Sequence, residues 1–250
     1  MIYQFNSRVR YSEVDEKQDL TLNGIINYFQ DCSTFQSEAL GLGLAHLAET
    51  HRAWLLSSWQ IVIDRLPVFG EDIMVQTWAY GFKAFYGDRN FALVDAKGSR
   101  IVRANSLWIY LDTETGRPVK PEKEQLEGYG MEERLDMDYA PRKIHLPEDM
   151  ERMEEFPVLR HQLDTNHHVN NGQYVQMARE FLPEGFQVYQ LRAEYKKAAV
   201  LHDVIVPMVH TADEVCTTAL CGKDGKPYAV IEFRERDTAS EKERKKLCCS

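Results

Sequence analysis

The segment "DTNHHVNNG", residues 164–172, gathers side chains that could perform hydrolysis. If the segment is extended, Asp164, Asn166 and His168 stand at i, i+2 and i+4 and share one side of the chain. The carboxylate could orient the imidazole, which could take a proton from water, while the amide holds a substrate carbonyl. We therefore predict a hydrolytic site with these three residues as its catalytic groups.

The asparagines that follow suggest a second role for the segment. Asn170 and Asn171 precede a helical pattern, where asparagine is a favoured N-cap, so we expect one of them to cap the helix. The unpaired N–H groups of the first helical turn, at Asn171 and Gly172, are expected to stabilise an oxyanion. Capping alone leaves the acid, the amide and the imidazole upstream unexplained.

A metal site is the third interpretation. His167 and His168 are adjacent, so in an extended loop their side chains would point to opposite sides. Other histidines, such as His161 and His202, show no helical i, i+4 pairing. The pattern does not favour a metal ion, no cofactor is expected, and His167 is predicted to be structural.

The predicted site belongs to the second of two similar halves. The stretch from Val9 resembles the stretch from Val158 in the order of its residue types, about 150 residues apart. Asp15 corresponds to Asp164, and an Asn-Gly pair follows in both stretches with a one-residue difference in loop length. A repeat on this scale indicates two units of the same architecture.

The match continues downstream. Residues 59–78 align with 190–209, which pairs Asp72 with Asp203, and runs of β-forming residues follow in both halves. "DAKG" at 95–98 and "KDGK" at 223–226 are typical of hairpin turns. Each half is thus an α+β unit with one helix and several antiparallel strands.

The two helices differ in length. The first is predicted over 23–48 with breaks at Gly41 and Gly43, and the second over 172–181. At helical spacing, the apolar side of the first helix comprises Leu22, Ile25, Ile26, Phe29, Cys32 and Phe35.

We divide the chain into an N-terminal unit (1–130), a linker (131–155), a C-terminal unit (156–236) and a charged tail (237–250) that we expect to be mobile. The linker is rich in charge and contains Pro141 and Pro147.

The composition excludes several classes of protein. The 250 residues carry a net charge of −9, which argues against nucleic acid as a partner. No apolar run approaches the ~20 residues of a membrane span. The five cysteines suggest no disulfide framework and no signal or transit segment is evident, so we expect a cytoplasmic protein with no membrane partner.

The motif Asp-x-Asn-x-His-Val-Asn-Asn, at 164–171, resembles that of the acyl-acyl carrier protein thioesterases of plants and bacteria. The resemblance covers most of the chain. It implies a tandem (double) hotdog, two antiparallel sheets each wrapped around a helix, with the acyl chain in the first half and catalysis in the second. The acyl-pocket candidates are Ile26, Phe29, Trp54 and Trp59, for which the alternative is ordinary core packing.

The chain departs from the plant pattern at one place. Where plant members have Glu-Cys, matched through Glu194 and Tyr195, this chain has Ala198 and Ala199. Glu194 lies four residues from that position, ~13 Å along a strand, so it cannot replace the missing carboxylate. We therefore expect direct attack by water without an acyl-enzyme.

The resemblance implies hydrolysis of fatty acyl-acyl carrier protein thioesters to free fatty acid. The acidic carrier would need a local basic patch, for which Arg192, Lys196 and Lys197 are candidates, unless they are ordinary solvated charges. A hotdog thioesterase acting on acyl-CoA and a non-catalytic acyl-binding protein are the alternatives, and a homodimer is possible.

Overall fold

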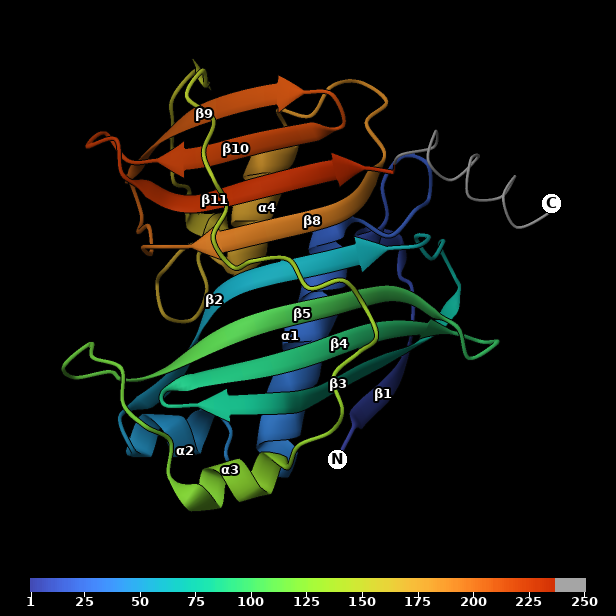
Figure 1. Cartoon of the computed structure of the whole chain (residues 1–250), viewed down its shortest axis with the longest axis vertical. Coiled ribbons are helices and arrows are strands. Elements are labelled where there is room, and N and C mark those ends of the chain that lie inside the picture. Colours follow the sequence, from blue (N-terminus) through green and yellow to red (C-terminus); the bar gives the residue numbers. More distant parts are fainter. Residues whose placement is uncertain (237–250) are drawn as a thin grey trace.

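The computed structural model of the chain describes residues 1–236 (Figure 1). The tail that we expected to be mobile, with Cys248 and Cys249, lies outside the described residues.

One antiparallel sheet runs through both halves of the molecule. Its strand order is β1-β3-β4-β5-β2-β8-β11-β10-β9-β6, and β7 pairs with β9. The halves meet where β2 pairs with β8, with Trp59 opposite Ala193. The two predicted sheets are therefore joined edge to edge, and neither has a free edge at the centre of the molecule. The strands are β1 (Tyr3–Arg8), β2 (Arg52–Ile63), β3 (Asp72–Lys83), β4 (Tyr86–Asp95), β5 (Arg100–Asp112), β6 (Glu151–Arg152), β7 (Phe156–Pro157), β8 (Val188–Tyr195), β9 (Val204–Ala212), β10 (Val215–Cys221) and β11 (Pro227–Glu235).

Helices α1 (Leu22–Ala39) and α4 (Asn171–Arg179) lie on the same side of this sheet, α1 behind the first half and α4 behind the second (Figure 1). The predicted helix over 23–48 is two helices, because Gly41 adopts φ +71° and α2 (Leu44–Glu49) begins afterwards. A third short helix, α3 (Lys123–Tyr129), follows β5. Within the described part of the chain, none of the helices is long and apolar enough to cross a membrane.

The apolar side predicted for α1 is buried except at one position. Leu22, Ile25, Ile26, Phe29 and Cys32 are all in the core, whereas Phe35 is 46% exposed. Phe35 packs edge-on against Phe5 of β1, 5.5 Å between ring centroids, at the margin of the sheet. Gln36, the next residue, is 3% exposed, so α1 is still covered at this level and Phe35 lies at the edge of its buried face.

The internal duplication is visible in the hydrogen bonds of the two loops that precede α1 and α4. Asp15 Oδ1 accepts from the N–H groups two and four residues later, at 2.9 and 3.1 Å. Asp164 Oδ1 does the same at 2.8 and 3.1 Å. The bridges Val14–Leu20 and Leu163–Val169 also correspond. The loops are thus equal in length, and the one-residue difference predicted from the Asn-Gly pairs is wrong.

A second detail of the repeat is also corrected. Asp203 Oδ2 accepts from Val200 N–H at 3.0 Å, and Glu71 Oε2 accepts from Val68 N–H at 3.1 Å. The counterpart of Asp203 is therefore Glu71 and not Asp72, which instead pairs with Arg8 at 2.7 Å.

The segment over 131–155 crosses the face of the sheet opposite the helices (Figure 1). Buried Gln60 on β2 donates to Asp138 O at 2.8 Å and accepts from Ala140 N–H at 2.9 Å. Buried Glu194 on β8 accepts from Ile144 N–H at 3.1 Å. Polar side chains of the two central strands therefore hold this connection in place.

Three aromatic rings form the centre of the first half's core. Phe91 lies 5.1 Å from Phe29 and 4.9 Å from Trp59, centroid to centroid, and none of the three is more than 2% exposed. Phe29→Ala is expected to lower the free energy of unfolding by ~3–5 kcal/mol, because it removes a fully buried ring and leaves a cavity. Chemical denaturation followed by tryptophan fluorescence would measure this. Phe35→Ala on the same helix is the matched control, and an equal loss there would contradict this account of the core.

Candidate active site

The predicted catalytic loop is a tight turn. Asp164 N–H donates to His168 O at 2.7 Å, His167 N–H donates to Asp164 O at 3.1 Å, and His167 adopts φ +60°. The extended geometry expected from the spacing is therefore wrong, because the Asp164 carboxylate draws two downstream N–H groups toward itself. The three predicted catalytic residues therefore lie on one hydrogen-bonded turn and not along an extended strand.

The turn leaves its polar side chains accessible. Asp164 is half-buried, while Asn166, His167 and His168 are exposed. Among the described residues, no side chain or backbone group forms a hydrogen bond with the His168 ring. The imidazole is thus open to a water molecule or a substrate.

The segment opposite the turn is the one in which the plant family would have Glu-Cys. His168 forms a β-bridge with Val200, and Val169 N–H donates to Ala199 O at 2.9 Å. Tyr174 of α4 accepts from Ala199 N–H at 2.8 Å and so ties this segment to the helix. Ala198, the first residue of this pair of alanines, is exposed, and Ala199 is buried.

Asn170 caps α4, as one of the two predicted asparagines was expected to do. Its Oδ1 accepts from Gly172 N–H at 2.9 Å. That N–H is therefore occupied, which counts against the oxyanion role predicted for Gly172. The N–H of Asn171 has no partner among the described residues, and the Asn171 carbonyl accepts from Tyr195 Oη at 3.0 Å. Asn171 is the remaining candidate for an oxyanion donor.

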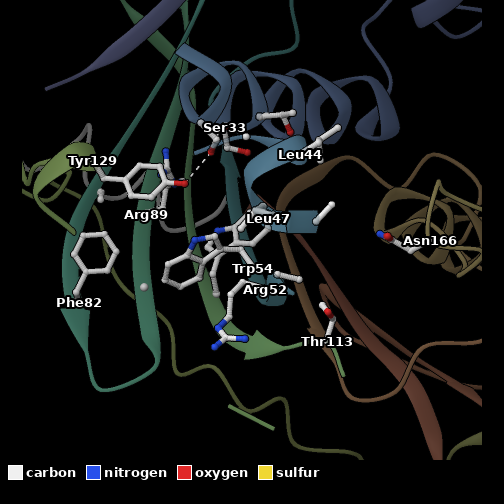
Figure 2. Close-up of a pocket in the computed structure, with 18 of the residues that line it drawn as sticks. Ser33, Leu44, Leu47, Arg52, Trp54, Phe82, Arg89, Thr113, Tyr129 and Asn166 are labelled. Atoms are coloured by element: carbon white, nitrogen blue, oxygen red, sulfur yellow. Dashed lines mark hydrogen bonds between the residues drawn. The ribbon is translucent and has the colours of Figure 1, made fainter. Parts of the chain in front are cut away.

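A cavity of about 470 Å³ lies in the first half, within the size range of small-molecule sites. Its walls come from α1, α2 and β2–β5, with a contribution from α3. One residue of the second half, Asn166, completes the lining (Figure 2). The cavity of one half thus reaches the predicted catalytic loop of the other. Its apolar lining includes Leu44, Leu47, Trp54, Phe82 and Trp108.

Of the four predicted acyl-pocket residues, only Trp54 lines this cavity. Ile26, Phe29 and Trp59 lie in the solid core instead, each at most 2% exposed. Sequence reasoning missed Arg52, Arg89 and Tyr129, which also line the cavity. Arg89 could have been found from the sequence, because it is a charged residue at a position of the strand that faces the core.

The predicted basic patch is largely engaged within the protein. Arg192 pairs with Glu232 at 3.0 Å and donates to two backbone carbonyls of the 131–155 segment. Lys196 pairs with Glu194 at 2.8 Å. Lys197 is exposed and lies over the Tyr228 ring, 5.3 Å from its centroid. Arg192 is therefore a structural residue, and the case for it as a carrier contact is not supported.

In the described part of the chain, no group of three His, Cys, Asp or Glu side chains could hold a metal ion.

Two family models match nearly the whole chain. The acyl-ACP thioesterase N-terminal domain matches residues 1–129, and the C-terminal domain of the same family matches 146–229. A duplicated α+β fold with one joined sheet agrees with this match. The chain belongs to the acyl-ACP thioesterase family.

Curated relatives include an oleoyl-acyl carrier protein thioesterase of Arabidopsis thaliana, 23% identical over 83% of this chain and 63% of the relative. A palmitoyl-acyl carrier protein thioesterase of Gossypium hirsutum is 21% identical over 85% of this chain and 56% of the relative. The chain thus spans about three-fifths of the length of these relatives.

Two solved structures show the same fold. An acyl-ACP thioesterase from Bacteroides thetaiotaomicron superposes with a TM-score of 0.86 at 20% identity, covering 94% of this chain and 98% of the other. A 12:0-ACP thioesterase from Umbellularia californica gives a TM-score of 0.83 at 17% identity, covering 94% and 97%. The expected double hotdog is therefore confirmed.

Proposed function

We propose that this protein hydrolyses fatty acyl-acyl carrier protein thioesters to free fatty acids. The observation that carries the proposal is that Asn166 of the second half lines the cavity of the first half. An acyl chain in that cavity would bring its thioester to the turn that contains Asp164 and His168. The family to which the chain belongs supports the same reaction.

In this mechanism His168 is the general base. Its imidazole takes a proton from water, and the resulting hydroxide attacks the thioester carbonyl, which Asn166 holds by its amide. The tetrahedral oxyanion is stabilised by Asn171 N–H at the start of α4. The C–S bond then breaks, the acid is released, and the leaving thiolate takes the proton from the imidazolium. Asp164 fixes the backbone of the turn that bears His168 by accepting from two of its N–H groups, and its negative charge favours the imidazolium form.

The division of labour follows the two units of the duplication. The N-terminal unit, 1–130, holds the acyl chain and the C-terminal unit, 156–236, supplies the catalytic groups. The carrier protein would dock at the mouth of the cavity. Of the predicted basic residues, Lys197 is exposed and has no acidic partner in the described part of the chain, so it is the best candidate for a contact with the carrier.

Hydrolysis without a covalent intermediate makes a prediction about thiol reagents. Cys32, Cys216 and Cys221 are buried, and burial raises the pKa of the Cys32 thiol to about 12, so it is not a thiolate at neutral pH. Alkylation of the native protein with iodoacetamide is therefore expected to leave kcat largely intact. Rapid quenching followed by mass spectrometry should detect no acylated peptide, and a stoichiometric acyl-cysteine would contradict direct attack by water.

The proposed function is tested with a panel of acyl chains, each presented on acyl carrier protein and on CoA. We expect the carrier-protein thioesters to give the higher kcat/KM at each productive chain length. Equal or better turnover of the CoA thioesters would make the protein an acyl-CoA thioesterase. Binding without turnover of any thioester would make it a non-catalytic acyl-binding protein.

A further inference from the structure

Three successive inward-facing residues of β4 divide the cavity from the core. Gly87 lines the cavity, and a Cβ at this position would lie only 3.1 Å from the Trp54 ring. Phe91 is fully buried among the core aromatic rings. Arg89 stands between them and lines the cavity. Along this face of β4, Arg89 is therefore the residue at the boundary between the cavity and the packed core.

Arg89 is a buried cation without a carboxylate partner. It is 9% exposed, and among the described residues no Asp or Glu oxygen lies within ion-pair distance of its guanidinium. Its Nη1 donates to Gln36 Oε1 of α1 and to Thr77 Oγ1 of β3, the latter at 3.1 Å. The guanidinium also lies over the Tyr129 ring, 5.3 Å from its centroid. Arginine stays protonated in such surroundings although burial lowers its pKa.

Arg52, the other arginine that lines the cavity, differs from Arg89 in having a carboxylate partner. Arg52 pairs with Asp112 at 2.6 Å, so its charge is compensated. Both of the side-chain hydrogen bonds that Arg89 makes come from Nη1, and both go to neutral groups. Among the described residues, the Nε and Nη2 groups of Arg89 make no such bond, so water in the cavity must solvate them.

Arg89 also lies at the end of the cavity away from the catalytic loop. Figure 2 shows Asn166 on one side of the lining residues, Arg89 with Tyr129 on the opposite side, and Leu47 and Trp54 between them. A chain whose thioester is at Asn166 would therefore direct its methyl end toward Arg89.

We propose that Arg89 sets the upper limit of acyl chain length, an inference that rests on the proposed function. Methylenes placed against the guanidinium would remove its remaining solvation without offering a hydrogen bond, which is costly for a buried charge. Each methylene that stops short of Arg89 gains burial without that cost. The chains that fit best are those that end before this polar boundary.

The test compares Arg89→Met with Arg89→Lys across a series of acyl-acyl carrier protein thioesters of increasing even chain length. Arg89→Met removes the charge and is expected to move the optimum to chains at least two carbons longer. For these longer chains, kcat/KM of the variant should be about tenfold higher than kcat/KM of the wild type. Arg89→Lys keeps the charge, so its optimum should stay at the wild-type length. Arg103→Met is the control outside the cavity, since Arg103 pairs with Asp64 at 3.0 Å.

An unchanged length profile in Arg89→Met, or an equal shift in Arg89→Lys, would overturn the proposal. Calorimetric titration of folded variants with free fatty acids of the same lengths gives a readout that does not need catalysis. If no thioester is hydrolysed but Arg89→Met still binds longer acids more tightly, the proposed function fails and the length limit stands. If hydrolysis occurs without any change in length preference, the reverse is true.

Discussion

His168→Ala is expected to lower kcat for acyl-thioester hydrolysis by ~10²- to 10⁴-fold, the usual contribution of a general base. The imidazole is exposed on the turn and free of protein partners among the described residues, so its removal should not disturb the fold. Steady-state assays with a saturating acyl-acyl carrier protein thioester would measure the loss.

The neighbouring histidine supplies the matched control for this experiment. His167 is equally exposed, but it adopts φ +60°, a conformation that asparagine tolerates well. His167→Asn should therefore keep near-wild-type kcat, and both variants should keep the far-UV circular dichroism of the wild type. A fully active His168→Ala would mean that another group activates the water.

Asp164→Asn should lower kcat by about 10²-fold, because the imidazolium loses its stabilising anion. Asparagine retains Oδ1, which can still accept from the N–H groups of Asn166 and His168, so the turn is kept. The substitution therefore separates the charge of Asp164 from its structural role. The quantities to measure are kcat and the midpoint of thermal unfolding.

Asp15→Asn is the matched control, since Asp15 makes the same pair of hydrogen bonds in the first half. Asp15 also lies 3.8 Å from Arg179, so this variant could lose some stability but no activity. Wild-type turnover by Asp164→Asn would show that Asp164 only shapes the turn.

The duplicated turns explain why the two halves are unequal. At the positions of Asn166 and His168, the first-half turn has Lys17 and Asp19. The same backbone scaffold therefore presents an ammonium and a carboxylate in place of an amide and an imidazole. Of the two turns, only the second has the amide and the imidazole that the proposed hydrolysis needs.

The repeat made most of the fold predictable. Helical patterns located α1 and α4, and the glycine-containing turns located both hairpins, at Gly98 and Gly225 with φ +82° and +74°. A cap at Asn170 or Asn171 followed from residue type and position alone, and Asn170 is the one that caps α4. These features depend on neighbours in the chain, which is why the amino-acid sequence is sufficient to predict them.

The cavity could not be located in the same way. Trp54 and Trp59 are five residues apart on β2, a spacing that puts side chains on opposite faces of a regular strand. A shift of register between Leu56 and Ser58 inserts an extra residue, so the two rings share a face. One lines the cavity and the other packs in the core. That difference depends on which elements lie opposite, and no local pattern encodes it.

The structural role of Asp164 in the turn was not predicted from the sequence. Its position in the motif predicted a carboxylate beside the imidazole, but the two backbone hydrogen bonds that it accepts depend on a turn that the spacing did not predict. Asp15 carried the same signal in the first half without any catalytic neighbours. A shared structural role therefore explains why both halves have an aspartate at this position.

We propose that the acyl chain lies in the first half while the second half cleaves the thioester. The most direct test of this proposal is photo-crosslinking with a non-hydrolysable acyl-carrier analogue that has a diazirine at the methyl end of the chain. We expect the label in peptides that line the cavity, those containing Trp54, Phe82 or Arg89. Labelling within 188–235 of the second half, and not in these peptides, would contradict the account.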